Sequence, residues 1–194
     1  MPTILFATGN QQKFLAAQAA FLKSHITLVQ KPVEIDEVQS EDSEYIIRDK
    51  ARRAFEILQQ PLIVSDDSWS VPGLNGFPGP YMKSMDHWLT PQNWLDLTAR
   101  LTDRRIILIQ RLAYQDKDTF KLFRSTYTGT ILTESRGKHG ATLQKVVTMP
   151  GDNGLSIAEV HDKGIEYADR EVVEGWQALI AWAHTLPHMA DIPA

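Results

Sequence analysis

The sequence of 194 residues contains no cysteine. This absence excludes disulfide bonds, thiolate nucleophiles and cysteine-rich zinc or iron–sulfur sites, so any bound metal must have oxygen or imidazole ligands. The chain also lacks an apolar run near the roughly 18 residues that span a bilayer, and its first apolar run, residues 3–7, is too short for a signal peptide. We therefore expect a cytoplasmic protein that has no membrane partner.

The chain also has no excess of basic over acidic residues. The chain has 20 Lys and Arg against 24 Asp and Glu, which gives a net charge of −4. Proteins that bind long nucleic acids release counterions from a basic surface, so this balance argues against a nucleic-acid partner. A small anion can still bind, because a helix N-terminus and one or two cations are enough to hold it.

The hydrophobic pattern predicts a single α/β domain over residues 1–194, with a mixed sheet and flanking helices. No repeat or linker divides the chain. A Thr90 N-cap and Pro91 predict the start of a helix. The turn at residues 115–118 predicts an antiparallel hairpin of residues 105–114 and 119–131. The other predicted strands cover residues 3–8, 26–29 and 62–65, and the other predicted helices cover residues 11–24, 43–58 and 168–186.

A candidate phosphate site follows the first predicted strand. Thr8, Gly9 and Asn10 precede a helix that carries Lys13 in its first turn. The free N–H groups and positive dipole end of such a helix attract phosphate, and Lys13 could contact the same anion. The alternative is structural: Asn10 caps the helix, Gly9 makes the turn and Lys13 is solvated.

Acidic residues form a second candidate site. Asp66, Asp67 and Ser68 follow the strand predicted to end at residue 65, and open α/β sheets bind ligands at such strand ends. Carboxylate oxygens there could bind Mg²⁺, which accepts one or two carboxylates together with substrate phosphates. A denser acidic run, residues 34–44, has the alternative interpretation of a solvated loop before a helix. Lys50 immediately precedes the apolar Ala51, so it could lie at the edge of that helix's apolar face and near the same site.

Residues 72–81 contain closely spaced glycines and prolines, which predicts an irregular loop long enough to bind a ligand. Together with the motifs above, this loop gives the chain a resemblance to the inosine triphosphate pyrophosphatase family over roughly residues 3–138. The matching segments are residues 8–10 with Lys13, 37–39, 50–51, 64–68, 122–129 and, as the most specific, 76–83.

The resemblance implies two lobes around a central cleft, a homodimer, and magnesium-dependent hydrolysis of a nucleoside triphosphate to the monophosphate and pyrophosphate. Enzymes of this family remove non-standard purine nucleotides. The implied metal ligands are Glu37 and Asp67, with Asp67 also activating water and Asp66 supporting it. The implied substrate-binding residues are Thr8, Gly9, Asn10, Lys13, Lys50, Ser68 and Lys83.

The base-reading motifs of that family are not retained. Residues 139–143 read His-Gly-Ala-Thr-Leu where the family has an aromatic-Gly-aromatic-Asp-Pro segment, and residues 173–175 read Val-Glu-Gly where it has Ser-His-Arg. Gln144, Lys163 or Arg170 could replace the missing donors. Two alternatives therefore stay open: the same chemistry on a different base, or a nucleotide-binding protein with little turnover.

Overall fold

The computed structural model describes residues 2–165 and 174–187, which form two compact units. The first unit consists of the described residues of Met1–Asp66, Gln110–Ser125 and Val172–Ala194, and the second consists of those of Asp67–Ile109 and Thr126–Glu171. Because the chain crosses between them several times, three strands, β3 (Leu62–Ser70), β5 (Arg105–Gln115) and β6 (Phe120–Ile131), have residues in both units.

The first unit has a parallel sheet edge. Strand β1 (Thr3–Phe6) pairs in parallel with β2 (Thr27–Gln30) and with β3, with Leu5 opposite Leu62 in the second pair. The order of strands in the sheet is β2-β1-β3-β5-β6-β7, and β4 pairs with β3. The helices of this unit are α1 (Gln11–Phe21), α2 (Ser43–Leu58) and α6 (Glu174–Ala183).

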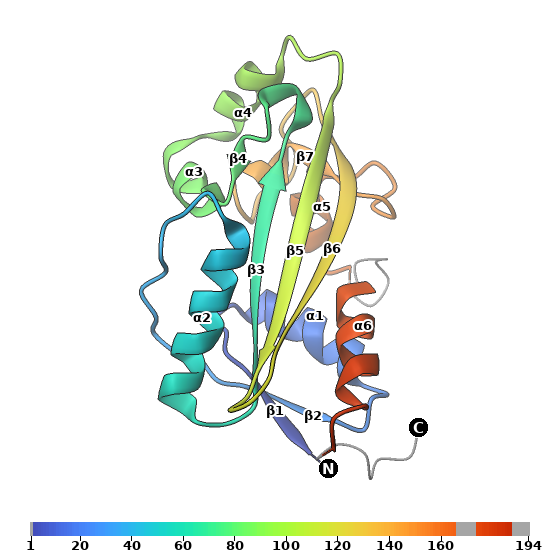
Figure 1. Cartoon of the computed structure of the whole chain (residues 1–194). Coiled ribbons are helices and arrows are strands. Elements are labelled where there is room, and N and C mark those ends of the chain that lie inside the picture. Colours follow the sequence, from blue (N-terminus) through green and yellow to red (C-terminus); the bar gives the residue numbers. More distant parts are fainter. Residues whose placement is uncertain (1, 166–173, 188–194) are drawn as a thin grey trace. The chain divides into compact units, whose positions relative to one another are not determined.

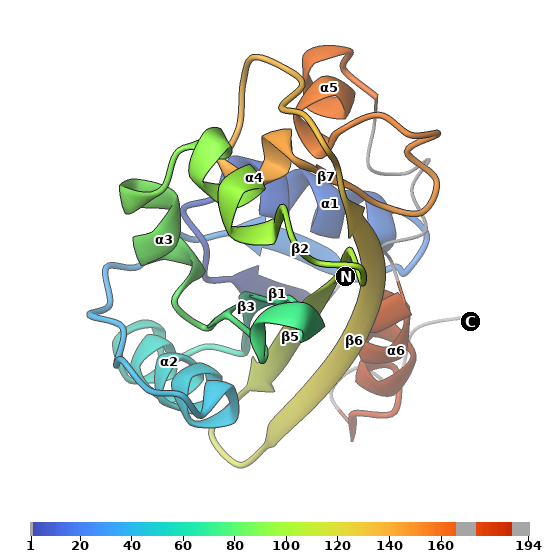
Figure 2. The ribbon, with the colours of Figure 1, turned by 90° about the horizontal axis from the view of Figure 1, so that it is seen from above.

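Alternation along the strands gives this unit two cores. Successive strand side chains point to opposite faces, so Ile4 and Phe6 pack with α1 and α6, whereas Leu5 packs with α2. Trp176 of α6 contacts Phe6 edge to face, with ring centroids 5.2 Å apart. Figures 1 and 2 show α2 on one side of the sheet and α6 with α1 on the other. Strands buried on both faces explain the continuous apolar runs in the sequence.

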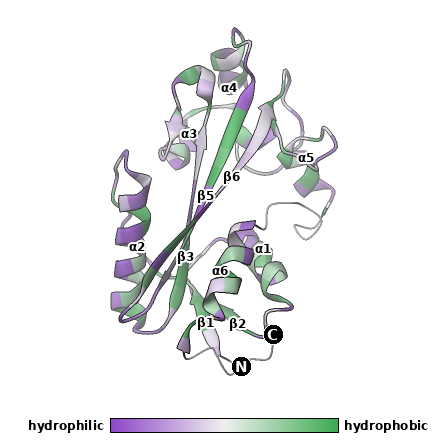
Figure 3. Cartoon of the chain, turned by 45° about the vertical axis from the view of Figure 1, so that its right-hand side comes forward, coloured by the Kyte–Doolittle hydropathy of each residue, from purple (hydrophilic) through white to green (hydrophobic). Residues whose placement is uncertain are grey.

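Helix α2 has the boundaries that the sequence predicts. Asp42 caps it by accepting hydrogen bonds from the N–H groups of Glu44 and Tyr45, and Gln59 ends it in the left-handed conformation. In Figure 3 hydrophilic and hydrophobic residues alternate along this helix, as expected where one face packs on a sheet and the other meets water. Part of the acidic run before the helix is therefore structural, because Asp42 is its N-cap.

The second unit packs around Trp94, whose side chain is buried. Trp94 lies on α4 (Pro91–Thr98), which begins with the predicted Thr90 cap. In this unit β3 pairs antiparallel with β4, and β6 with β7. Its remaining elements are the 3₁₀ turns η1 (Pro72–Leu74) and η2 (Leu143–Lys145), strands β4 (Pro78–Gly79) and β7 (Val147–Thr148), and helices α3 (Met82–Trp88) and α5 (Ile157–Asp162).

The predicted α/β fold with a mixed sheet is confirmed, and so is the hairpin of β5 and β6. Several local predictions are wrong. Strand β3 continues to Ser70 instead of ending at residue 65, and the loop at residues 72–81 contains η1 and β4. Three other elements end earlier than predicted: β1 at Phe6 instead of residue 8, α1 at Phe21 instead of residue 24, and α6 at Ala183 instead of residue 186. Residues 168–173 of the predicted last helix lie outside the described residues. Within residues 2–165 and 174–187, no helix combines the length and hydropathy needed to cross a membrane.

Candidate functional site

The loop between β1 and α1 has the structure expected of a helix N-terminus. The Asn10 side chain accepts a hydrogen bond from the Lys13 N–H at 3.0 Å, and the Thr8 hydroxyl accepts one from the Asn10 N–H at 3.1 Å. Gln30 of β2 donates to the Thr8 carbonyl at 3.2 Å. The capping role of Asn10 is thus confirmed. It is compatible with anion binding, because one side chain satisfies only part of the free N–H groups of a first turn.

Gly9 is exposed in this loop, as is Asn10. A Cβ atom added to it would meet no other atom within 4 Å. The fold therefore has room for a larger side chain at this position. The open space beside the backbone is what a ligand needs in order to approach main-chain N–H groups closely.

Lys50 and Glu37 meet in the first unit, although they are 13 residues apart. The Lys50 Nζ atom lies 2.6 Å from Glu37 Oε1 and donates a second hydrogen bond to the Ser65 carbonyl at 3.2 Å. The two side chains are 20% and 34% exposed. Ser65 directly precedes Asp66, so Lys50 connects the acidic loop before α2 with the acidic segment of β3.

The acidic pair of β3 lies within the strand and not at its end, which corrects the sequence expectation. Consecutive residues of a strand point to opposite faces, so Asp66 and Asp67 diverge. Asp66 shares a face with Leu62 and Val64, which pack with α2. The pattern misled because polar side chains follow the apolar run, while the backbone continues to pair with β4.

Arg111 is a charged residue of this region that the sequence analysis missed. It lies on β5 and is only 8% exposed. Burial lowers the pKa of its guanidinium, the charge of Asp66 opposes that shift and the charge of Arg124 adds to it. The available signal is an arginine in the middle of a mainly apolar strand, next to Gln110.

Three predicted site residues belong to the second unit. Asp67 follows Asp66 in β3, Ser68 is the next residue and is buried, and Lys83 is exposed on α3. The other predicted residues belong to the first unit: Thr8, Gly9, Asn10, Lys13, Glu37, Lys50 and Asp66.

The segment at residues 139–143, also in the second unit, is held by the chain's own polar groups. Asp86 of α3 accepts hydrogen bonds from both the N–H and the hydroxyl of Thr142, and Gln144 accepts one from the Ala141 N–H at 2.9 Å. His139 Nδ1 lies 2.7 Å from an oxygen of Asp162 on α5. Of the other two suggested replacement donors, Lys163 is exposed and Arg170 lies outside the described residues.

The carboxylate of Glu37, beside Lys50, is chemically suited to bind Mg²⁺. Within the described part of the chain, no three acidic or histidine side chains form a cluster that could hold a metal by themselves. Mg²⁺ does not need such a cluster, because it takes one or two carboxylates together with waters and substrate phosphates. Glu37, a partly exposed carboxylate, fits this requirement.

Comparisons with known proteins agree with the motifs. The model of the Ham1 family matches residues 4–164. A dITP/XTP pyrophosphatase of Saccharolobus solfataricus is 30% identical over 145 residues, which cover 75% of this chain and 76% of that protein. Inosine triphosphate pyrophosphatase 2 of Trypanosoma cruzi is 27% identical over 161 residues, or 82% of each chain.

A solved structure supports the fold. The structure of a HAM1 protein from Coxiella burnetii has a TM-score of 0.73 and 20% identity, and the match covers 96% of this chain and 100% of that one. At this identity the likeness concerns the fold alone. The family match and the more similar relatives confirm the resemblance seen in the sequence motifs.

Proposed function

The chain belongs to the Ham1 family, and we propose that it hydrolyses nucleoside triphosphates to monophosphates and pyrophosphate with Mg²⁺ as cofactor. As a family member it is an enzyme of the nucleoside-triphosphate pyrophosphatase class with a house-cleaning role in nucleotide metabolism. The names of its relatives support non-standard purine nucleotides as the substrate class. We further propose that it works as a homodimer in the cytoplasm.

The observation that carries the proposal is the meeting of Lys50, Glu37 and the Ser65 carbonyl in the first unit. A cation and a carboxylate side by side can bind the two halves of a metal–triphosphate complex. The ammonium attracts phosphate oxygens and the carboxylate attracts the metal. A purely structural ion pair needs neither the adjacent acidic strand nor the open loop at Gly9.

Each proposed role follows from the chemistry of its side chain. The N–H groups of the loop before α1, with Lys13, bind phosphate oxygens. Lys50 adds a second cation, and Lys83 a third from α3. Asp67 orients a water molecule and takes its proton as that water attacks the α-phosphorus, so that pyrophosphate leaves. Asp66 and Ser68, which face away from Asp67 in β3, contribute to the site from the face of the strand that packs with α2. Glu37 and Asp67 would hold Mg²⁺, and the chemistry that this ion would supply is stabilisation of negative charge on the phosphate oxygens.

The test is a product analysis with a panel of nucleoside triphosphates, with and without Mg²⁺. We expect pyrophosphate to be the first product, formed only with a divalent ion. The variant Asp67→Asn should lose about 10²- to 10⁴-fold in turnover, as expected for loss of a general base, and should still bind nucleotide. Exposed Asp96 of α4, replaced by Asn, serves as a control for loss of one carboxylate.

Orthophosphate as the first product, or full activity of Asp67→Asn, would contradict this function. Nucleotide binding without pyrophosphate release would favour a binding protein on the same fold. Sedimentation of the purified chain tests the proposed homodimer separately.

A further inference from the structure

The carboxylate that the proposed function gives to the metal already contacts a cation of the chain. The 2.6 Å separation of Lys50 Nζ and Glu37 Oε1 is short even for a charge-assisted hydrogen bond. The ammonium and the metal would therefore share one carboxylate. Two cations this close to each other repel, and partial burial of both side chains leaves that repulsion only partly screened.

We propose that Lys50 exchanges between two alternative anionic partners, the Glu37 carboxylate and the phosphate of the substrate. This inference rests on the proposed function, because Glu37 is taken as a metal ligand. Binding of metal at Glu37 displaces the ammonium, and the displaced ammonium binds phosphate. Lys50 thus couples the binding of the metal to the binding of the nucleotide.

The geometry around Lys50 allows it to leave Glu37 and still keep its hydrogen bond to the Ser65 carbonyl. A lysine has a flexible stem and three N–H donors. The hydrogen bond to the Ser65 carbonyl uses one of them, and Ser65 is buried in β3, so this acceptor is fixed. The ammonium can turn from Glu37 while it keeps the Ser65 carbonyl as a pivot.

Coupling of this kind is reciprocal. If phosphate withdraws Lys50 from Glu37, nucleotide must raise the affinity for metal by the same factor as metal raises the affinity for nucleotide. In the absence of nucleotide, Lys50 should therefore lower the affinity for metal. Removal of its charge should change the two affinities in opposite directions, which loss of a structural contact would not do.

The experiment measures Mn²⁺ binding without nucleotide, by electron paramagnetic resonance or calorimetry, for the wild type and Lys50→Met. We expect Lys50→Met to bind Mn²⁺ about tenfold more tightly, within the usual range of coupling between sites. The same variant should bind the nucleoside triphosphate more weakly in the presence of a chelator. The double variant Glu37→Gln, Lys50→Met should lose the gain in Mn²⁺ affinity.

Arg53→Met is the matched control. Arg53 also pairs with a carboxylate of α2, its Nε lying 2.7 Å from Asp49 Oδ2, so this variant removes one paired cation from the same helix. We expect its Mn²⁺ affinity to stay within about twofold of the wild type, because surface pairs have small effects. Lys50→Gln provides the same comparison if Lys50→Met does not fold.

Unchanged or weaker Mn²⁺ binding by Lys50→Met would overturn the inference. So would an equal gain in Arg53→Met, because that would make the effect one of net charge. The wild-type assay for pyrophosphate release separates the two proposals. Pyrophosphate release together with unchanged Mn²⁺ binding by the variant would refute only the exchange, whereas no pyrophosphate release would refute the proposed function.

Discussion

Asp86 and Thr142, which are 56 residues apart, are joined by two hydrogen bonds to one oxygen, Asp86 Oδ1. The Thr142 hydroxyl also accepts a hydrogen bond from Trp94 Nε1 at 3.2 Å. Since Trp94 is 1% exposed, its indole N–H depends on this acceptor. One threonine thus connects α3, the central tryptophan of α4 and the segment at residues 139–143.

Replacement of Thr142 by valine tests this connection. Valine keeps the shape of the side chain and removes the hydroxyl, so the buried Trp94 N–H loses its acceptor. We expect the free energy of unfolding to fall by about 1–3 kcal/mol, measured by denaturant titration. Thr133→Val, at an exposed position, should change it by less than about 0.5 kcal/mol. Equal effects of the two variants would show that the network around Thr142 adds no stability.

Gly9→Ala separates binding from stability. The added Cβ would meet no atom of the chain within 4 Å, so we expect the free energy of unfolding to change by less than about 0.5 kcal/mol. The methyl group would occupy the space through which, in the proposed function, phosphate approaches the backbone. Nucleotide affinity should therefore fall on the order of tenfold, a change of about 1.4 kcal/mol. Calorimetric titration with a nucleoside triphosphate measures this loss.

Gly129→Ala is the contrasting variant. Its Cβ would lie 2.6 Å from the Thr148 carbonyl oxygen in the adjacent strand β7, where the backbone cannot yield easily. We expect it to lower stability by about 1–3 kcal/mol, as overpacking does.

Unimpaired nucleotide binding by Gly9→Ala would place the phosphate site elsewhere.

The parts of the fold that the sequence predicts well are those set by local signals. The exact limits of α2 follow from the Asp42 cap and one apolar face, and α4 follows from Thr90 and Pro91. The end of β3 was wrong because strand pairing with β4 continues past the apolar run. Helices α3 and α5 are short, with 7 and 6 residues, so their patterns are too brief to read.

In the candidate site, too, local features follow from the sequence and contacts between distant segments do not. The cap at Asn10 is a local feature, and the sequence offers it as one of two interpretations. Lys50 was placed near the site only in general terms, and its contacts with Glu37 and Ser65 require the packing of α2 on β3. The buried position of Arg111 depends on both faces of β5 being covered, which no short sequence pattern reports.

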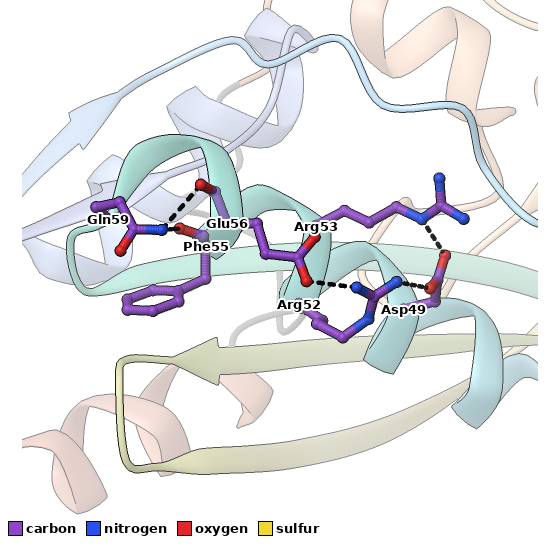
Figure 4. A network of polar contacts seen from close by, with 6 residues as sticks. All are labelled: Asp49, Arg52, Arg53, Phe55, Glu56 and Gln59. Carbon is purple, nitrogen blue, oxygen red and sulfur yellow. Dashed lines mark hydrogen bonds and ion pairs between the residues drawn. The ribbon is translucent and has the colours of Figure 1, made fainter.

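Asp49 is the centre of an ionic network on α2 that makes stability depend on pH (Figure 4). Arg52 and Arg53 each lie 2.7 Å from its oxygens. The hydrogen bond from Arg52, aided by the charge of Arg53 and opposed by burial, lowers the pKa of Asp49. A carboxyl whose pKa is lower in the folded state stabilises the fold above its unfolded pKa of about 3.9. That contribution is lost as the pH falls through the folded value.

We therefore expect Asp49→Asn to lower the free energy of unfolding at pH 7 by about 1 kcal/mol, since both arginines are partly exposed. The difference from the wild type should shrink below about pH 4 and vanish at lower pH. Glu56→Gln, which removes a more exposed partner of Arg52, should have a smaller effect. Denaturant titrations from pH 2.5 to 7 measure both variants, and a difference that is independent of pH would contradict this role of Asp49.

Base selectivity is the property in which this chain should differ most from the family it belongs to. A site that hydrogen-bonds a substrate group rejects analogues lacking that group, because its own polar atoms are then left unpaired. At residues 139–143 the polar groups of Ala141 and Thr142 are already bonded to Gln144 and Asp86. These groups therefore offer a base fewer free donors. The energetic penalty for binding an analogue that lacks a hydrogen-bonding group should be correspondingly small.

We expect the ratio of kcat/KM for inosine and xanthosine triphosphates over guanosine and adenosine triphosphates to stay below about 100-fold. An apolar slot discriminates among groups by only about 10- to 200-fold. Steady-state kinetics with these four nucleotides and the pyrimidine triphosphates measures the ratio. A preference well above 100-fold would contradict this expectation and show that other residues, such as Lys163 or Arg170, supply the donors. Lys163→Ala and Arg170→Ala would then identify which one, because the residue that reads the base must lower the preference and leave pyrophosphate as the product.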